Sequence, residues 1–428
     1  MTQRRRNAAV LGVAGTVTLL LAGCLGTGTG TDAPAVEDAE GPLTIQSRLA
    51  SDSGDALALE AVVDAFNAKG GGQVEINTVP NETFRDQLPS YLTSPTPPDV
   101  LTLYGGSLTR ELADEGLLLD LSDVWEGAEF SDGLRALSTD SSGKQVFIPT
   151  SYYWLGVYYK KSVWEAAGAE VPTTWDEMLT AADALEANGV VPIGIALGDA
   201  PWLASAWFDY LNLRVNGADF HIDVLAGDES FDDPRIEAVF EKWDDVLPYF
   251  DPEAPGIAFG QAATDLTQGR TGMFLAGSWL TFSLPPESLD EYDYFQFPII
   301  DDSVPLAEEG PTDGFVGAAN TDQPKLTKEF LAYLASAEAQ QLMFEANPND
   351  TLIPANPNVD VELGPDAIKG QAILESAVGG VTQFFNRDSS DALQATADQA
   401  LTQYLAGAKS LSDILAEWQS EAERVRAG

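Results

Sequence analysis

The stretch 172–197 contains a complete helix signal followed by a strand signal, and it constrains the fold more than any other part of the sequence. Thr174 and Glu177 have the spacing of a capping box, in which two side chains satisfy backbone N–H groups of the first helical turn. Apolar residues then recur at helical spacing, Gly189 is a helix stop, and the apolar run that begins at Val190 is typical of a strand. A helix that leads directly into a buried strand is the repeating unit of an α/β fold.

The same alternation occurs earlier in the chain. Segments 42–50, 72–80 and 99–104 have the composition of strands, and amphipathic helical patterns separate them. A further strand pattern covers 271–279, and from Lys325 onward the chain is mainly helical. We therefore predict an α/β protein with mainly parallel sheets that are flanked by helices on both faces.

Length and charge limit the classes of protein that this chain can join. The 428 residues are long for one core, which favours two domains. The formal net charge of −45 argues against nucleic-acid binding, because the phosphates of nucleic acids require Lys and Arg to displace their counterions. The same charge argues against peripheral binding to anionic lipid, which requires a polybasic face.

Residues 1–23 have the layout of a secretory signal peptide, with arginines at 4–6 and an apolar run over 8–22. The run is shorter than the roughly 20 residues of a transmembrane helix. The sequence LAGC ends at Cys24, the only cysteine, and resembles a bacterial lipobox, which implies cleavage before Cys24 and a lipid on its thiol; an ordinary signal peptide with an incidental cysteine is the alternative. Residues 24–41 then have the composition of a flexible tether. We expect a protein anchored by lipid outside the cytoplasmic membrane, exported by Sec, with Tat left open by the three arginines.

The residue content excludes several catalytic chemistries. One histidine, His221, and one cysteine rule out His-based triads, Cys-His pairs and His-rich zinc sites. His221 is expected to be a structural or solvent-facing residue. The chain also lacks the P-loop, dinucleotide-binding and GxSxG patterns outside the tether. The sequence therefore predicts neither an enzyme nor a cofactor nor a bound metal, although 67 acidic residues leave a paired-carboxylate hydrolase open.

Aromatic residues stand at the predicted strand ends. Ligands of open α/β sheets bind beyond the carboxyl ends of the strands. Tyr and Trp rings suit the CH-rich faces of sugars, whose hydroxyls need fixed polar partners. The pattern favours a carbohydrate-binding cleft, and the residues that carry it are Tyr104, Tyr152, Tyr153, Trp154, Trp202 and Trp279.

Four stretches resemble the extracellular solute-binding proteins of bacterial ABC importers, in the carbohydrate-binding group (family 1) that includes maltose-binding protein. They are PPDVLTLYGG with LADEGLLLDLSD, then IPTSYYWLGVYYKKSVWEAAGAEVPTTWDEMLTAADAL, then GRTGMFLAGSW, and finally KEFLAYLASAEAQQLM. Their order behind a lipobox is more specific than any one of them. Lys160 departs from the pattern, because many relatives have asparagine there.

The resemblance implies a periplasmic-binding-protein-like fold of type II, with two α/β lobes that are discontinuous in sequence and a ligand between them. We place the crossings near Thr150, Arg270 and Phe315. The predicted N-terminal lobe is then 42–150 plus 271–315, and the predicted C-terminal lobe is 151–270 plus 316–428.

The resemblance also implies the ligand contacts and the partners. By position, the ligand-binding residues are Asp52, Tyr104, Tyr153, Trp154, Trp202, Trp279 and Phe384 (or Phe385), and we add Asp313 as an acceptor for sugar hydroxyls. Ligand that touches both lobes would favour hinge closure. The closed form, a monomer, would dock on ABC permease subunits, and the lipid would raise its effective concentration near them.

Three other functions remain open at this point. A ferric-ion carrier of the same fold would use paired tyrosines, for which Tyr152 and Tyr153 are the candidates. A polyamine carrier would fit the acidity and could use Trp rings as a cation cage. A secreted glycoside hydrolase would need two of the many carboxylates across a sugar.

Overall fold

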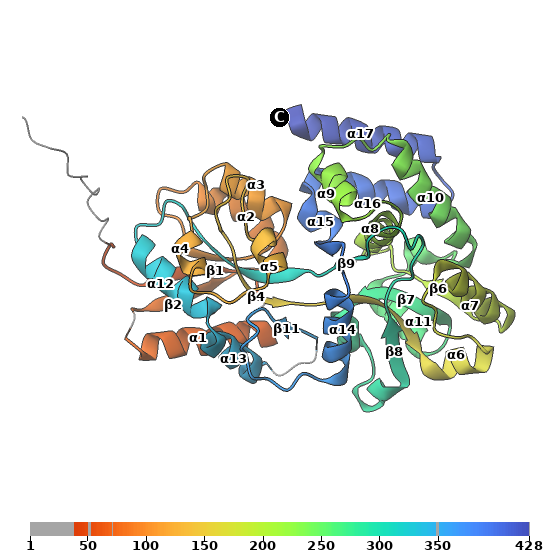
Figure 1. Ribbon diagram of the computed structural model, residues 1–428, viewed down its shortest axis with the longest axis horizontal. Coiled ribbons are helices and arrows are strands. Elements are labelled where there is room, and N and C mark those ends of the chain that lie inside the picture. Colours follow the sequence, from red (N-terminus) through yellow and green to blue (C-terminus); the bar gives the residue numbers. More distant parts are fainter. Residues whose placement is uncertain (1–37, 50–52, 71, 348–350, 428) are drawn as a thin grey trace, which may run out of the picture. The chain divides into compact units, whose positions relative to one another are not determined.

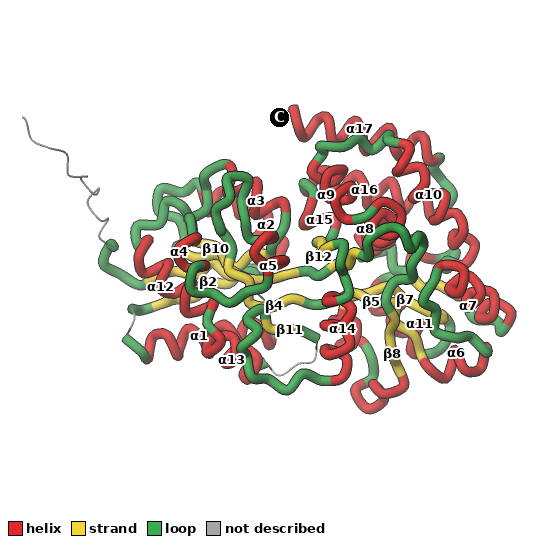
Figure 2. Tube along the Cα trace, viewed as in Figure 1, coloured by secondary structure: helices red, strands yellow, loops and turns green. Residues whose placement is uncertain are grey.

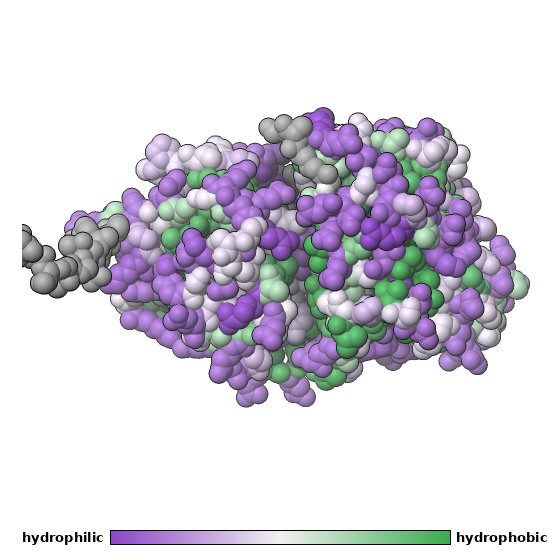
Figure 3. Space-filling view, turned by 45° about the horizontal axis from the view of Figure 1, so that its top comes forward, coloured by the Kyte–Doolittle hydropathy of each residue, from purple (hydrophilic) through white to green (hydrophobic). Residues whose placement is uncertain are grey.

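The computed structural model describes residues 38–49, 53–70, 72–347 and 351–427, and these residues form one compact unit (Figure 1). The predicted signal peptide, Cys24, most of the predicted tether and Asp52 lie outside the described residues. Within the described residues, no helix combines the length and the apolar character needed to cross a bilayer. The face in Figure 3 is largely hydrophilic, as the strongly acidic composition leads one to expect.

The first sheet has six strands in the order β11-β4-β10-β3-β1-β2. Strands β2, β1 and β3 run parallel to one another, whereas β10 runs antiparallel to β3 and β4, and β11 runs antiparallel to β4. Helices α1, α2, α3, α4, α5, α12 and α13 belong to the same lobe. The bounds are β1 (Leu43–Ser47), α1 (Gly54–Ala68), β2 (Val74–Thr78), α2 (Asn81–Leu92), β3 (Val100–Tyr104), α3 (Ser107–Asp114), α4 (Ser122–Trp125), α5 (Asp132–Leu137), β4 (Ile148–Tyr152), β10 (Thr312–Gly317), α12 (Pro324–Ala335), α13 (Ala337–Ala346) and β11 (Ile353–Pro354).

Both faces of this sheet are buried, and strand β3 shows why. Its side chains alternate, because successive residues of a strand point to opposite faces. Val100 packs in a cluster with α1, α12 and α13, whereas Leu101 and Leu103 pack in a second cluster with α2 and α3. All five residues of β3 are buried, which explains why the strand is apolar except for Thr102.

The second sheet has four strands in the order β6-β7-β5-β8, and a separate parallel pair joins β9 to β12. Strand β5 is antiparallel to β7 and β8, and only β6 and β7 are parallel. Figure 2 shows the strands of both sheets in yellow among the helices. The bounds are β5 (Leu155–Lys160), α6 (Lys161–Ala167), α7 (Trp175–Ala187), β6 (Val191–Gly194), α8 (Trp202–Asn216), α9 (Ala218–Ala226), α10 (Pro234–Val246), η1 (Leu247–Tyr249), η2 (Ala254–Gly256), α11 (Phe259–Thr267), β7 (Thr271–Gly277), η3 (Ser278–Ser283), η4 (Pro286–Glu291), β8 (Tyr292–Phe295), β9 (Ala307–Glu309), α14 (Pro365–Glu375), β12 (Gly380–Thr382), α15 (Phe385–Asp388), α16 (Asp391–Leu405) and α17 (Leu411–Ala427).

These pairings define two lobes that each combine distant parts of the sequence. We call N-terminal lobe the described residues of 38–152 and 312–354, and C-terminal lobe the described residues of 155–309 and 364–427. The α/β class and the two discontinuous lobes agree with the prediction, but the sheets are mixed rather than mainly parallel. The antiparallel strands β10 and β7 enter their sheets after long excursions of the chain, and nothing in their own sequences fixes a direction.

The chain crosses between the lobes at short connections. Residues 153–154 join β4 to β5, and residues 310–311 join β9 to β10. These two crossings lie side by side, since the backbone N–H of Tyr153 donates to the carbonyl of Pro311 at 3.2 Å. A third passage, over 355–364, leads from β11 to α14.

The lobe boundaries differ from the predicted ones. Crossings are found close to Thr150 and Phe315 but not near Arg270. The segment 271–295 stays in the C-terminal lobe, because the fully buried strand β7 pairs with β5 and β6. Conversely, the described residues of 316–354 belong to the N-terminal lobe, where α13 packs against α1 and β11 pairs with β4.

The capping box of α7 is present as predicted. The backbone N–H of Glu177 donates to Thr174 Oγ1 at 3.4 Å, and the N–H of Thr174 donates to Glu177 Oε2 at 3.1 Å. We expect Thr174→Ala to lower the free energy of unfolding by about 1 kcal/mol, because the first turn loses a side-chain acceptor. Urea denaturation measures the effect, and Thr174→Ser, which keeps the acceptor, should match the unmodified chain. Equal loss in both variants would contradict the assignment of the effect to the cap.

Candidate ligand-binding site

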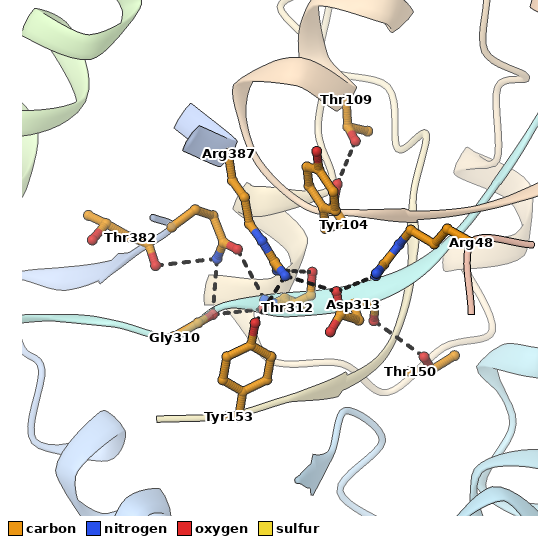
Figure 4. A network of polar contacts seen from close by, with 11 residues as sticks. Arg48, Tyr104, Thr109, Thr150, Tyr153, Gly310, Thr312, Asp313, Thr382 and Arg387 are labelled. Carbon is orange, nitrogen blue, oxygen red and sulfur yellow. Dashed lines mark hydrogen bonds and ion pairs between the residues drawn. The ribbon is translucent and has the colours of Figure 1, made fainter. Parts of the chain in front are cut away.

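A network of ion pairs joins the two lobes around Asp313 on β10 (Figure 4). Arg48, which follows β1, donates from Nη2 to Asp313 Oδ1 at 2.7 Å. Arg387 of α15, in the C-terminal lobe, places its Nη2 3.2 Å from the same oxygen. Figure 4 shows the two guanidinium groups approaching Asp313 from opposite sides. One carboxylate therefore pairs with two arginines, and the cluster of Arg48, Asp313 and Arg387 carries a net positive charge.

Two tyrosines hold the guanidinium of Arg387 in place. Its Cζ lies 4.6 Å from the centroid of the Tyr104 ring, and its Nη2 donates to the hydroxyl of Tyr153 at 3.0 Å. The ring of Tyr104 also lies 5.5 Å from the Cζ of Arg48. Burial works against the charge of Arg387, but Tyr153, Asp313 and Tyr104 outweigh it and raise the pKa of this arginine. Arg387 is thus a fixed cation at the junction of the lobes.

An aromatic wall lies next to this network. We give this name to Tyr153, Trp202, Trp279 and Phe384, which come from the crossing at 153–154, the start of α8, η3 and the residue before α15. The ring centroids of Tyr153 and Trp279 are 5.5 Å apart, and those of Trp202 and Phe384 are 5.9 Å apart. Trp279 lies 5.9 Å from both Trp202 and Phe384. Trp202, Trp279 and Phe384 are only partly buried, so they keep ring surface for a ligand.

The position of Trp279 depends on the glycine that ends β7. A Cβ added at Gly277 would lie 1.6 Å from the Trp279 ring, so the ring folds back directly over this residue. The backbone N–H of Ser278 donates to the carbonyl of Trp154 at 3.0 Å and fixes the turn that carries the ring. Only glycine at position 277 leaves room for this arrangement.

The other predicted aromatic contacts lie elsewhere. Trp154 is fully buried, stacks on Tyr294 at 5.7 Å and covers Gly370, so its ring belongs to the core of the C-terminal lobe. Phe385 is buried against Phe208, which leaves Phe384 as the member of this pair in the aromatic wall. The structure therefore brings together Tyr104, Tyr153, Trp202, Trp279, Asp313 and Phe384, and it separates Trp154 from them.

A cavity with both polar and apolar lining residues adjoins Asp313 within the N-terminal lobe. Its free volume is about 90 Å³, and its polar lining residues include Arg48, Asp55, Thr150 and Asn347. Burial and the neighbouring carboxylate of Asp313 raise the pKa of Asp55. Such a mixture of donors and acceptors can bind hydroxyl groups.

Arg48, Asp55 and Arg387 are not among the predicted site residues. Arg48 follows β1 directly, Tyr104 is the last residue of β3, and Arg387 is three residues from Phe384. Both arginines therefore stand beside a strand end or a predicted contact residue, but a search for aromatic residues alone does not find them.

The tyrosine pair is poorly suited to bind ferric ion. Burial raises the pKa of Tyr153 well above its ordinary value, and burial together with Glu375 raises that of Tyr152 to about 12. The surroundings of both hydroxyls therefore disfavour the tyrosinate anions that a ferric site would need. The described residues also contain no group of three or more His, Cys, Asp and Glu side chains that could hold a metal.

Comparison with known proteins gives a consistent result. The family model for bacterial extracellular solute-binding proteins matches residues 50–341. The osmoprotective compounds-binding protein GgtB of Synechocystis sp. is 25% identical over 74% of this chain and 78% of its own length. The alpha-glucosides-binding periplasmic protein AglE of Rhizobium meliloti is 24% identical over 76% of this chain and 75% of its own.

Solved structures extend the likeness to both lobes. The bacterial solute receptor AcbH, described as preferring β-D-galactopyranose, superimposes with a TM-score of 0.82 at 26% identity, over 90% of this chain and 99% of its own. The family model spans more than half of the 428 residues. The chain therefore belongs to the bacterial extracellular solute-binding proteins.

Proposed function

We propose that this protein binds a carbohydrate between its lobes, outside the cytoplasmic membrane, and delivers it to the permease of an ABC importer. The observation that carries the proposal is the aromatic wall beside the Arg48–Asp313–Arg387 network. Flat rings next to fixed charged hydrogen-bonding groups complement the two kinds of surface that a sugar presents.

We propose a role in sugar binding for each group of the network and of the aromatic wall. Rings of the wall would stack on the sugar, Asp313 would accept from its hydroxyls, and the two arginines would donate to its oxygens. Asp313 belongs to the N-terminal lobe, whereas Trp202 and Phe384 belong to the C-terminal lobe. A sugar that contacts both sets would stabilise the arrangement in which the lobes meet, and no covalent bond of the sugar needs to break.

The relatives support a carbohydrate. AglE is named for alpha-glucosides, and AcbH is described as preferring a galactopyranose. A cationic ligand such as a polyamine is less compatible, because two arginine side chains point at the proposed site and would repel it.

We also propose that Cys24 carries a lipid that tethers the protein to the outer face of the membrane. The lipobox-like sequence before Cys24 and the Gly- and Thr-rich residues after it support this proposal. A tether of this kind raises the concentration of the carrier near its permease.

Thermal melting against a panel of compounds tests the function. The chain from residue 25 onward is melted alone and with D-galactose, maltose, raffinose, spermidine or ferric citrate. A ligand at about 100 times its Kd stabilises the folded state by about 2.7 kcal/mol, which gives a clear rise in Tm. A rise with a sugar supports the proposal. A rise with spermidine or ferric citrate alone would overturn the carbohydrate assignment and leave the family membership intact.

A further inference from the structure

Two fully buried carboxyl groups lie beneath the proposed site in the C-terminal lobe. Asp209 is on α8, and Glu309 is the last residue of β9, directly before the crossing at 310–311. Helix α8 packs against β9, and each of the two carboxyl groups acts on the pKa of the other. They belong to none of the groups that the proposed function uses.

Three of the four carboxyl oxygens of Asp209 and Glu309 are buried without a hydrogen-bond donor from the part of the chain that the structure describes, which calls for a proton on the pair. Asp209 Oδ2 accepts the backbone N–H of Phe385 at 3.0 Å. Among the described residues, no N–H or ordinary hydroxyl donor reaches Asp209 Oδ1 or either oxygen of Glu309. An ionised carboxylate can only accept, so a hydrogen bond between two carboxyl groups exists only when one of them carries a proton.

The surroundings of the pair also disfavour two negative charges. Burial, and the nearby carboxylates Glu308, Asp388 and Asp398, raise the pKa of the pair. His221 on α9 supplies no charge, because burial lowers its pKa to about 3, although its Nε2 lies 3.8 Å from Asp209 Oδ1. The other groups that act on the pair or its neighbours are Tyr153, Tyr210, Arg110, Arg214 and Arg387.

The cations among these groups have other partners. Arg214 pairs with Glu308, Arg387 pairs with Asp313, and Arg110 donates to Ser107 Oγ and acts on the pKa of Asp388. Burial still raises the pKa of Asp398, to about 6, and that of Asp388. Among the described residues, no cation is therefore left to neutralise a second negative charge on Asp209 and Glu309. A proton shared between them would do so.

The pair supports the segment 384–388, which connects it to the site. The backbone N–H of Phe385 donates to Asp209, while Phe384 is part of the aromatic wall and Arg387 pairs with Asp313. Asp388, at the end of this segment, contacts the N-terminal lobe, where its Oδ1 accepts a hydrogen bond from the backbone N–H of Ser107 at 3.0 Å. Contact across the lobes is close here, since a Cβ at Gly106 would lie 2.6 Å from the carbonyl oxygen of Arg387.

We propose that Asp209 and Glu309 share one proton, and that its loss to solvent at alkaline pH releases the segment 384–388 from its position against the N-terminal lobe. Two carboxylates confined to one buried site repel each other, so Asp209 must turn away or admit water. A cavity of about 10 Å³, lined by Asp209, Trp202 and Phe384, has room for a single water molecule. Asp209 is thus a positioning residue for Phe384 and Arg387. We also expect the affinity for sugar to fall when the segment is released, and this expectation rests on the proposed function.

Infrared spectroscopy tests the shared proton without any ligand. The unmodified chain at pH 7 should show the C=O band of a protonated carboxyl that Asp209→Asn/Glu309→Gln lacks, and the difference should vanish by pH 9.5. No difference between the two spectra at pH 7 would overturn the proposal. Should the double variant not fold, the pH-dependent loss of the band in the unmodified chain, against that in Glu309→Gln, decides the same point.

Backbone hydrogen exchange tests the release of the segment. Between pH 6 and 9.5, peptides that cover 383–388 should lose protection in the unmodified chain more than in Asp209→Asn, whose amide stays neutral and can donate to Glu309. Asp176→Asn, at an exposed position of α7, is the matched control and should follow the unmodified chain. Equal profiles in Asp209→Asn and the unmodified chain would overturn the proposal.

The link to sugar binding is tested by measuring the Kd of the panel sugar that raises Tm. Its Kd should rise at least tenfold from pH 7 to 9.5 in the unmodified chain and stay constant in Asp209→Asn. A constant Kd in both proteins would refute the link between the pair and sugar binding. If none of the three panel sugars raises Tm, the proposed function fails at that step, while the infrared and exchange results still decide whether the proton is shared.

Discussion

Gly277→Ala is expected to remove most of the affinity for the bound sugar while leaving the fold intact. The new methyl group would occupy the position of the Trp279 ring, only 1.6 Å from one of its carbons, so the ring must leave the aromatic wall. Losing one stacked indole costs about 2–3 kcal/mol of binding free energy, roughly a 30- to 150-fold rise in Kd. Isothermal titration calorimetry with the panel sugar that raises Tm measures this change.

Two variants separate displacement of the ring from a general effect of the methyl group. Gly256→Ala is the matched control, since a Cβ at Gly256 meets no atom within 4 Å, and its Kd should equal that of the unmodified chain. Trp279→Ala should reproduce the loss that Gly277→Ala causes. A folded Gly277→Ala protein with unchanged Kd would show that Trp279 does not contact the sugar.

The largest loss of stability is expected from Arg214→Met. Arg214 is 2% exposed, pairs with the fully buried Glu308 and donates from Nε and Nη2 to the carbonyl of Phe297 at 3.1 and 2.9 Å. Its removal leaves Glu308 with only neutral donors, Tyr210 and Gln296. An uncompensated buried charge of this kind lowers the free energy of unfolding by about 3–5 kcal/mol. Urea denaturation at pH 7 measures it.

The pH dependence and two further variants check this explanation. Burial already raises the pKa of Glu308, and without Arg214 this carboxyl should protonate more readily, so the penalty should shrink as the pH falls from 7 to 5. Arg214→Met/Glu308→Met should be more stable than Arg214→Met, because no buried charge remains. Arg424→Ala, which breaks an exposed pair with Glu421, should change stability little. A loss in Arg214→Met as small as that in Arg424→Ala would contradict the prediction.

Local signals predicted the elements well. The capping box at Thr174 and the buried strand that ends at Tyr104 are visible in the sequence, because caps and apolar runs depend on neighbouring residues. Strand direction is different, since it depends on the partner strand. The segment TGMFLAG is buried along its whole length and suits either sheet, which is why the expected crossing near Arg270 is absent.

For the site residues, too, some positions are indicated by the local sequence, and others depend on packing between distant parts of the chain. Tyr153, Trp202 and Trp279 are proposed from their places at predicted strand ends and Phe384 from the family resemblance. Their rings lie together, and their contact with a ligand stays a prediction. Trp154 was not separable from Tyr153, since adjacent residues at a lobe crossing face opposite ways and only packing on Tyr294 decides between them. Asp209 and Glu309 carry no mark in a chain with 67 acidic residues, and their burial arises from the packing of α8 on β9.

The buried imidazole of His221 makes the C-terminal lobe chemically addressable. It is the only histidine in the chain, and it has no exposed surface. A reagent that acylates imidazole can reach it only when α8 and α9 separate, so each labelled molecule records one opening of that lobe. The modification rate under native conditions therefore gives the opening free energy of one lobe from a single site, without a fluorophore or an engineered cysteine. Any change of that rate with added sugar reports directly on how strongly the ligand holds this half of the molecule together.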